Sequence, residues 1–285
     1  MAPPEGLRTG PPDFVGVGAF RSAAAGWFGC LLEHPRIDPP VGAETQDHFF
    51  DAFCTREMEA ADVERYHALF PRRPGALCGE WRPRYMYDPW TPMLLRRAAP
   101  GARLLVMLGD PAARYRARLA ADLVEDRAED DFYLPDVVGR ARYATQLRRL
   151  LEHFDAEQVL VLQHERCSAE PVGEYRRTLR FLGLPDDHVP RRLRGFKPGR
   201  DDRDLRFPTA AEAAKRRVVA AATRRREPEP PPLWPELEDA LHAELDGEMA
   251  ELAEMVPELD LSLWPGFAGA PRRAGEPAEM PQAAS

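Results

Sequence analysis

Apolar residues occur along the chain in short runs that alternate with stretches of helical periodicity. The run at 13–18 predicts a buried strand that ends in a glycine turn, and residues 21–33 predict the helix that follows. His34 and Pro35 end this helix, because proline disfavours helical conformation at the preceding residue. Strand, glycine turn and helix in this order are typical of a βαβ unit, whose helix N-terminus directs backbone N–H groups at an anion.

A second strand and helix follow the same plan. Residues 102–108 predict an apolar strand, Gly109 begins the turn, and Asp110 is the predicted N-cap of a helix that begins at Pro111 and extends to residue 121. The elements predicted further along are a helix at 141–154, a strand at 158–163 and a helix at 171–182 that Gly183 closes. Helices that alternate with short, continuous apolar strands indicate a parallel sheet covered by helices.

The pattern changes after residue 207. An Ala- and Arg-rich helix is predicted at 210–226, a stiff proline-rich linker at 227–232 and a long helix at 234–255. The apolar residues of the long helix recur at helical spacing and lie on one face, which consists of Leu237, Leu241, Leu245, Met249 and Leu252. This helix is therefore expected to pack against the rest of the chain.

These elements predict one domain of the α/β class rather than two independent domains. We expect a three-layer sandwich with a central parallel sheet over residues 13–265. Within it, the helix and linker at 208–232 lead to a C-terminal helical addition at 233–265. Residues 1–12 are predicted to be flexible, because they are rich in Pro and Gly, and residues 266–285 are predicted to be disordered.

Composition and charge exclude several classes of protein. The chain of 285 residues has 39 Lys+Arg against 47 Asp+Glu, and its net charge of −8 argues against nucleic-acid binding. No apolar run reaches the roughly 18–20 residues that span a bilayer. The N-terminus also lacks the basic and apolar regions of a secretory signal. We therefore expect a cytoplasmic protein that binds neither nucleic acid nor membrane.

The cysteines and histidines show no pattern of a disulfide framework or a metal centre. Cys30, Cys54, Cys78 and Cys167 are widely spaced and form no Cys-x-x-Cys pair, so we expect buried, reduced thiols. The seven histidines show no metal-ligand spacing with one another, and no metal site is predicted.

Six segments between residues 13 and 265 carry motifs. They lie at 14–35 (the strand, glycine loop and helix, then His-Pro), 47–51 (Asp-His-Phe-Phe-Asp), 79–86 (Gly-Glu-Trp-Arg-Pro-Arg-Tyr-Met), 104–114 (the strand, then Gly-Asp-Pro-Ala-Ala-Arg), 143–184 (ending in Phe-Leu-Gly-Leu) and 233–264 (ending in Leu-Trp). In this colinear order they resemble the sulfotransferases that use the sulfate donor PAPS, in particular the bacterial and heparan-sulfate-type branch with its P-loop-like fold.

The resemblance implies that a sulfuryl group is transferred from PAPS to a hydroxyl or amine of a carbohydrate or small-molecule acceptor. Arg21 would stabilise the leaving phosphate, and Asp47 or Glu44 would take the proton of the acceptor. His48 is a further catalytic candidate, and Glu80 and Arg84 are candidates for substrate binding. An ordinary surface position is the alternative for Asp47 and Glu44, a packing role is the alternative for His48, and a solvated turn is the alternative for the segment 194–200, which holds Lys197 and Arg200. The implied donor-binding residues are Arg21, Ser22, Ala23, Ala24, Ala25, Gly26, Asp110, Arg114, Lys197 and Arg200.

The chain departs from the family pattern at its polar positions. The replacements are Ala23, Ala24 and Ala25 for Gly-Thr-Thr, Thr45 and Gln46 for Lys-Glu, Trp81 and Arg82 for Lys-Ser, and Gly109 and Ala117 for the Arg and Ser that hold the 3′-phosphate of the donor. Two hypotheses follow: an enzyme with an altered donor site, or a catalytically inactive member of the fold that acts as a binding or scaffold protein. A P-loop kinase is not expected, because the sequence lacks Gly-x-x-x-x-Gly-Lys-(Ser/Thr).

Overall fold

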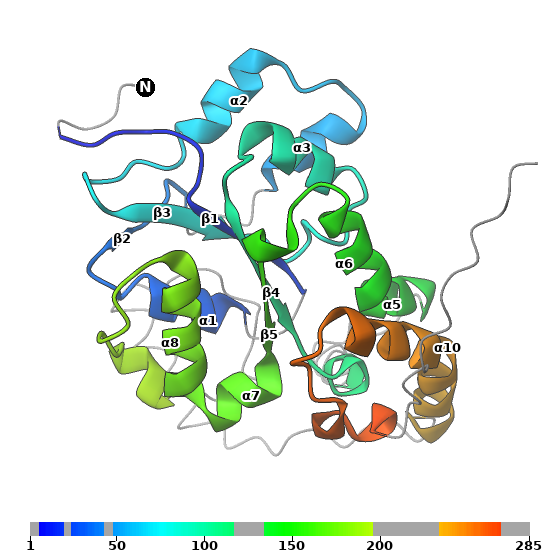
Figure 1. Ribbon diagram of the computed structural model, residues 1–285. Helices are drawn as coiled ribbons and strands as arrows, with labels where there is room; N and C mark the ends of the chain where they lie inside the picture. Colours follow the sequence, from blue (N-terminus) through cyan, green and yellow to red (C-terminus); the bar gives the residue numbers. More distant parts are fainter. Residues whose placement is uncertain (1–5, 20–23, 43–47, 117–133, 196–233, 269–285) are drawn as a thin grey trace, which may run out of the picture.

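The computed structural model describes residues 6–19, 24–42, 48–116, 134–195 and 234–268 (Figure 1). These ranges contain the central sheet and the helices that cover it. The predicted helix at 210–226 and the predicted linker at 227–232 lie outside the described residues, as does the end of the helix predicted at 111–121.

Within the described residues, the centre of the molecule is a five-stranded parallel sheet with the order β2-β3-β1-β4-β5. The middle strand β1 pairs in parallel with β3 and with β4, and all of its residues are buried. Burial of a whole strand is expected where helices cover both faces of a parallel sheet. The predicted α/β class with a central parallel sheet is therefore confirmed. The strands are β1 (Phe14–Gly18), β2 (Ile37–Asp38), β3 (Leu77–Trp81), β4 (Arg103–Leu108) and β5 (Val159–Gln163).

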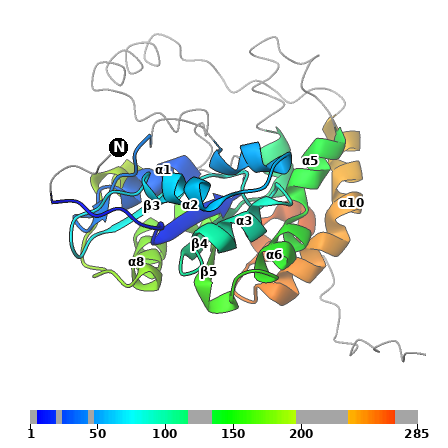
Figure 2. The same cartoon turned by 90° about the horizontal axis from the view of Figure 1, so that it is seen from above.

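Helices lie on both sides of this sheet (Figure 2). They are α1 (Ala24–Leu31), α2 (Ala60–His67), α3 (Thr91–Ala98), α5 (Leu134–Ala141), α6 (Tyr143–Leu151), α7 (His164–Ala169), α8 (Pro171–Leu182) and α10 (Trp234–Met255). The short 3-10 helices are η1 (Phe49–Cys54), η2 (Ala156–Gln158), η3 (Arg191–Gly195), η4 (Leu261–Leu263) and η5 (Pro265–Phe267). None of the described helices combines the length and the apolar character that crossing a membrane requires.

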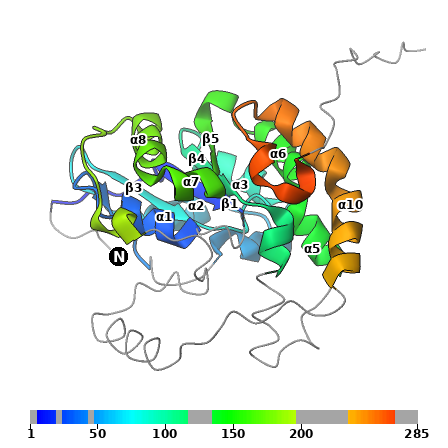
Figure 3. The same ribbon diagram turned by 90° about the horizontal axis from the view of Figure 1, so that it is seen from below.

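Alternate residues of β1 belong to two separate hydrophobic cores. Phe14 packs in one core with residues of α1 and α8, and Val15 packs in the other with residues of α2, α3, α6 and α10. Successive side chains of a strand point to opposite faces of the sheet, which explains the division. The helix α10 lies beside α5 and α6, and so extends the second core (Figure 3).

The locally patterned elements have the predicted positions. The helices α8 and α10 match their predicted ranges, and Gly183 closes α8 in the left-handed conformation with a φ of 73°. The helix predicted at 141–154 is shorter, because α6 covers Tyr143–Leu151. The pattern does not predict β2, β3, α2 or α3. Gly79 and Glu80 interrupt the apolar run of β3, and β2 is only two residues long.

Near both chain ends, described residues contact the rest of the domain. Arg8 pairs with Arg72 in an antiparallel bridge, and the Arg72 guanidinium donates to the carbonyl of Pro11 at 2.7 Å. Arg8 and Pro11 thereby contact the domain through Arg72. Phe267 is buried, with its ring packed edge-on against His242. The start of the tail predicted at 266–285 thus contacts the core, and residues 269–285 lie outside the described residues.

The described cysteines are free thiols. Cys30, Cys78 and Cys167 are buried as predicted, and burial raises the pKa of Cys30 and of Cys78 to about 12, so these thiols stay protonated at neutral pH. Cys54 differs from the prediction, because it is exposed at the end of η1.

Candidate functional site

The carboxyl ends of the parallel strands meet along one edge of the sheet. Gly18, Trp81, Leu108 and Gln163 are the last residues of β1, β3, β4 and β5. In open α/β sheets, ligands bind outside this edge, where the loops between strands and helices converge. The candidate site is therefore built from the segments that follow these four residues.

The glycines of β1 are required by the packing of neighbouring side chains. A Cβ added at Gly16 would overlap the indole of Trp81, and one added at Gly18 would overlap the side chain of Met86. Trp81, which stands where the resemblance expects a lysine, is only 1% exposed and belongs to the hydrophobic core. This position therefore supplies no cation to the site.

The helix α1 begins the segment to which the resemblance assigns donor binding. Ala24 is buried, Ala25 is half-buried and Gly26 is exposed. The first backbone N–H groups of a helix have no acceptor within the helix, so they are suited to an anion. Trp27 is buried beneath this turn and its indole N–H donates to the hydroxyl of Thr178 at 3.4 Å.

Several predicted site residues lie outside the described residues. They are Arg21, Ser22, Ala23, Asp47, Lys197 and Arg200, together with the alternative base Glu44. The structure leaves their predicted roles untested.

Asp110 is the N-cap of the helix that follows β4, as the sequence predicts. Its Oδ1 accepts the N–H groups of Ala112 at 2.9 Å and of Ala113 at 3.3 Å. Burial raises the pKa of Asp110 in spite of these bonds, and the charge of Glu165 raises it further. In this arrangement the carboxylate of Asp110 holds the helix start.

Arg114 lies next to Asp110 on the same turn of helix. Its guanidinium donates to the hydroxyl of Tyr143 and lies 5.4 Å from the centre of that ring. The Tyr143 hydroxyl in turn donates to the carbonyl of Gly109 at 2.9 Å. The structure thus brings Asp110 and Arg114 together, as the resemblance implies, and places Gly109 between them and β4.

Glu165 is the acidic residue of this edge that the sequence analysis missed. Its Oε1 accepts the N–H of Asp110 at 3.0 Å, and its Oε2 accepts the indole N–H of Trp264 at 2.9 Å. The Nδ1 atom of His164 lies 3.7 Å from Oε1. Although burial raises the pKa of Glu165, hydrogen bonds from His164, the Asp110 N–H and Trp264 outweigh it, and the pKa lies below its ordinary value. The signal in the sequence that could have found Glu165 is its position, just after the strand predicted at 158–163.

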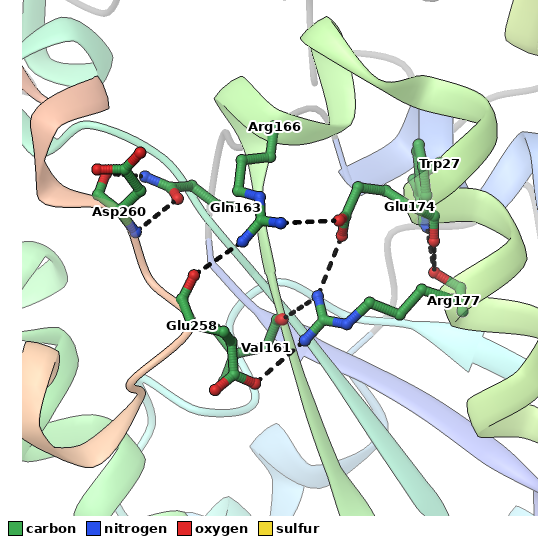
Figure 4. Close-up of polar contacts among 9 residues, drawn as sticks. Trp27, Val161, Gln163, Arg166, Glu174, Arg177, Glu258 and Asp260 are labelled. Carbon is green, nitrogen blue, oxygen red and sulfur yellow. Dashed lines mark hydrogen bonds and ion pairs between the residues drawn. The ribbon is translucent and has the colours of Figure 1, made fainter.

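The C-terminal segment 256–264, which carries Trp264, is held to the end of β5 by polar contacts (Figure 4). The side chain of Gln163 donates to the carbonyl of Asp260 at 2.8 Å and accepts its N–H at 3.1 Å. Arg166 donates to the carbonyl of Glu258 at 2.8 Å. These contacts fix the segment that brings the Trp264 indole to Glu165.

Glu80 and Arg84, the predicted substrate-binding residues, have different surroundings. Glu80 is buried, and its two oxygens accept the Tyr66 hydroxyl at 2.7 Å and the Nε of Arg82 at 2.9 Å. Both oxygens therefore have protein partners. The Arg84 side chain is 32% exposed, and its guanidinium pairs with Asp51 at 3.5 Å and with buried Asp88 at 3.3 Å.

His48, the remaining catalytic candidate among the described residues, packs against an aromatic ring. It is half-buried, and its ring lies edge-on to Tyr85 with the centroids 6.3 Å apart. This is the packing environment that the sequence analysis kept as an alternative to catalysis. Among the described residues, no group of three or more His, Cys, Asp or Glu could hold a metal ion.

Sequence and fold comparisons point to the same enzymes. No family model matches the sequence. The chain is 28% identical over 170 residues to heparan sulfate glucosamine 3-O-sulfotransferase 3B1 of Mus musculus, a match that covers 54% of this chain and 42% of that protein. It is 27% identical over 169 residues to heparan sulfate glucosamine 3-O-sulfotransferase 6 of Homo sapiens, with coverage of 54% and 48%. The match spans less than half the length of these curated relatives.

A solved sulfotransferase has the same fold over most of its length. The structure from Alicyclobacillus acidocaldarius superposes with a TM-score of 0.60 and 23% identity, covering 89% of this chain and 98% of that chain. The parallel sheet and the glycine-rich strand β1 agree with this likeness. In sequence, in motif order and in fold, the chain is thus similar to sulfotransferases.

Proposed function

We propose that the chain transfers a sulfuryl group from PAPS to a hydroxyl or amine of a carbohydrate or small-molecule acceptor. The observation that supports this most strongly is the similarity to heparan sulfate 3-O-sulfotransferases, in a chain whose middle strand β1 ends in Gly18 immediately before the loop and α1. These relatives are named for their action on heparan sulfate, which favours a sulfated glycan as the acceptor.

The proposed mechanism relies on positioning and on electrostatic stabilisation. Sulfuryl transfer moves negative charge onto the leaving phosphate oxygen, which a cation beside that oxygen stabilises. Arg21 fills this role, and the backbone N–H groups from Ser22 to Gly26 hold the phosphosulfate at the start of α1. Asp47 or Glu44 takes the proton from the acceptor hydroxyl. Arg84, which is partly exposed, provides a contact for an anionic acceptor.

The second candidate function is a binding or scaffold protein that retains the fold without catalysis. The observation that favours it is the position of Trp81. A lysine is expected there, yet the indole is buried against Gly16 and no cation can approach from that side chain. In addition, the neighbouring Arg82 is buried and paired with Glu80. Loss of charged groups at the donor site would weaken or abolish sulfuryl transfer, while the outer surface of the fold could still bind a partner.

Transfer of labelled sulfate from PAPS to a heparan sulfate oligosaccharide tests the proposal. We expect measurable transfer by the unaltered chain and a loss of about 100-fold or more in Arg21→Ala, because the leaving group then lacks its cation. Arg97→Ala, which removes an exposed arginine of α3, is the matched control and should retain full transfer. Absence of transfer from a folded chain would favour the scaffold function, and equal transfer by both variants would remove Arg21 from the mechanism.

A further inference from the structure

The turn after β4 has unusual charge for a site that is expected to bind a phosphate. The resemblance assigns an arginine at position 109 and a serine at position 117 to the 3′-phosphate of the donor. Gly109 has no side chain, and position 117 is an alanine. A Cβ at Gly109 would lie 3.6 Å from Oε1 of Glu165. A carboxylate therefore stands beside the position from which a cation is expected to act.

The backbone donors of this turn are already used within the protein. The N–H of Asp110 donates to Glu165, and the N–H groups of Ala112 and Ala113 donate to Asp110. Pro111 has no N–H to offer. The donors that usually receive a phosphate at a helix start are therefore occupied by two carboxylates of the chain itself.

Among the described residues, the charged and titratable groups that face this turn come from three elements: the helix after β4, α7 and α10. Asp110 and Glu165 are acidic, Arg114 is the described cation beside them, and His242 of α10 faces Asp110, so the charges sum to a negative value when the histidines are neutral. The Nδ1 atom of His164 lies 3.7 Å from Oε1 of Glu165. A phosphate dianion at this turn would be repelled, whereas a hydroxyl could donate to a free lone pair of either carboxylate.

We propose that the donor site of this chain does not recognise a 3′-phosphate, and that it takes a nucleoside 5′-phosphosulfate with a free 3′-hydroxyl at least as well as PAPS. This inference rests on the proposed function, because it concerns which end of the nucleotide donor is recognised. It assigns the 5′-phosphosulfate to the start of α1 and the 3′-hydroxyl to the acidic turn of Asp110 and Glu165.

Calorimetric titration of the full chain with two nucleotides tests the inference. Adenosine 5′-phosphate and adenosine 3′,5′-bisphosphate differ only in the 3′-phosphate. We expect the monophosphate to bind with a Kd equal to or lower than that of the bisphosphate. Tighter binding of the bisphosphate by about tenfold or more would overturn the inference and leave the proposed function standing. Absence of binding of both nucleotides at millimolar concentration would overturn the proposed function and this inference together.

A pair of glycine variants locates the effect at the turn. Gly109→Arg adds the missing cation, and the nearest atom to the new Cβ is the His164 Cβ at 3.4 Å, an ordinary contact. We expect this variant to bind the bisphosphate at least about tenfold more tightly relative to the monophosphate than the unaltered chain does. Gly101→Arg adds the same charge in open space at the amino end of β4, whereas the candidate site lies at its carboxyl end. This variant should leave the ratio of the two Kd values unchanged. An unchanged ratio in folded Gly109→Arg would also overturn the inference.

Discussion

Glu165 joins three segments that are distant in the sequence. It lies in the first turn of α7, and its oxygens accept from Asp110 at the end of β4 and from Trp264 in the C-terminal segment. Its side chain is 25% exposed, so the charge is largely removed from water. A carboxylate in such a place is tolerated because N–H donors stabilise its ionised form. This single side chain therefore sets both the geometry and the charge of the β4 turn.

At the residue scale, we predict that Trp264→Phe lowers the free energy of unfolding by about 1–3 kcal/mol at pH 7, in addition to any packing loss, because Glu165 then lacks a donor. The pKa of Glu165 lies below its ordinary value of 4.5. The hydrogen bond therefore stabilises the fold above that pH, and this part is lost as the pH falls through the folded pKa.

Urea denaturation of Trp264→Phe from pH 7 down to about pH 2 provides the measurement, because the folded pKa of Glu165 lies below 4.5. Trp90→Phe is the control, because the Nε1 of Trp90 is buried and has no hydrogen-bond partner in the described structure. The destabilisation by Trp264→Phe should shrink in acid, whereas that of Trp90→Phe should not. A pH-independent loss in both variants would show that packing alone accounts for the effect.

At the element scale, side-chain polar contacts to β5, α7 and α8 position the segment 256–264, whose helix η4 is only three residues long. Arg177 of α8 donates to the carbonyl of Val161 at 3.2 Å, to Glu174 at 3.0 Å and to Glu258 at 3.1 Å (Figure 4). Glu174 is buried and also lies 3.7 Å from Arg166. One arginine thus connects β5, α8 and the C-terminal segment.

We predict that Arg177→Ala lowers the free energy of unfolding by about 2–4 kcal/mol, because it leaves buried Glu174 with only a distant cation and Val161 without its donor. Arg176→Ala is the matched control, since Arg176 is exposed on the same helix. Chemical denaturation measures both values, and hydrogen exchange of residues 256–264 should accelerate in Arg177→Ala alone. Equal stability and exchange in the two variants would contradict the role assigned to Arg177.

At the scale of the whole molecule, α10 completes a core that also includes the sheet. Leu241, Leu245, Met249 and Leu252 are buried, and they belong to the same core as Val15 of β1. The C-terminal helix therefore shares its hydrophobic contacts with the central domain, and the two are expected to unfold together.

We predict that Leu245→Ala lowers the free energy of unfolding of the whole domain by about 2–5 kcal/mol, because it leaves a cavity in this common core. Thermal unfolding followed by circular dichroism and by tryptophan fluorescence should show one coincident transition that moves to a lower temperature. Leu263→Ala, at a position that is 37% exposed, should have little effect. Two separate transitions would show that α10 is an independent unit.

The local elements could be predicted wherever their periodicity was visible. The apolar runs of β1, β4 and β5 and the one-sided pattern of α10 are properties of adjacent residues, and so is the glycine stop of α8. β3 could not be found in this way, because it buries Glu80, whose charge is paired only in the folded chain. Asp110 and Arg114 were predicted from motif order, and the structure brings them together.

The sequence by itself determined the alternation of strands and helices and hence the helix-covered parallel sheet. Its motifs, in colinear order, also indicated the similarity to sulfotransferases. The tertiary structure alone decided the charge of the site, because Glu165 and Trp264 are 99 residues apart and meet only when the C-terminal segment docks on β5. Local preferences act over a few residues, whereas a buried hydrogen bond depends on which distant donor the packing brings to it.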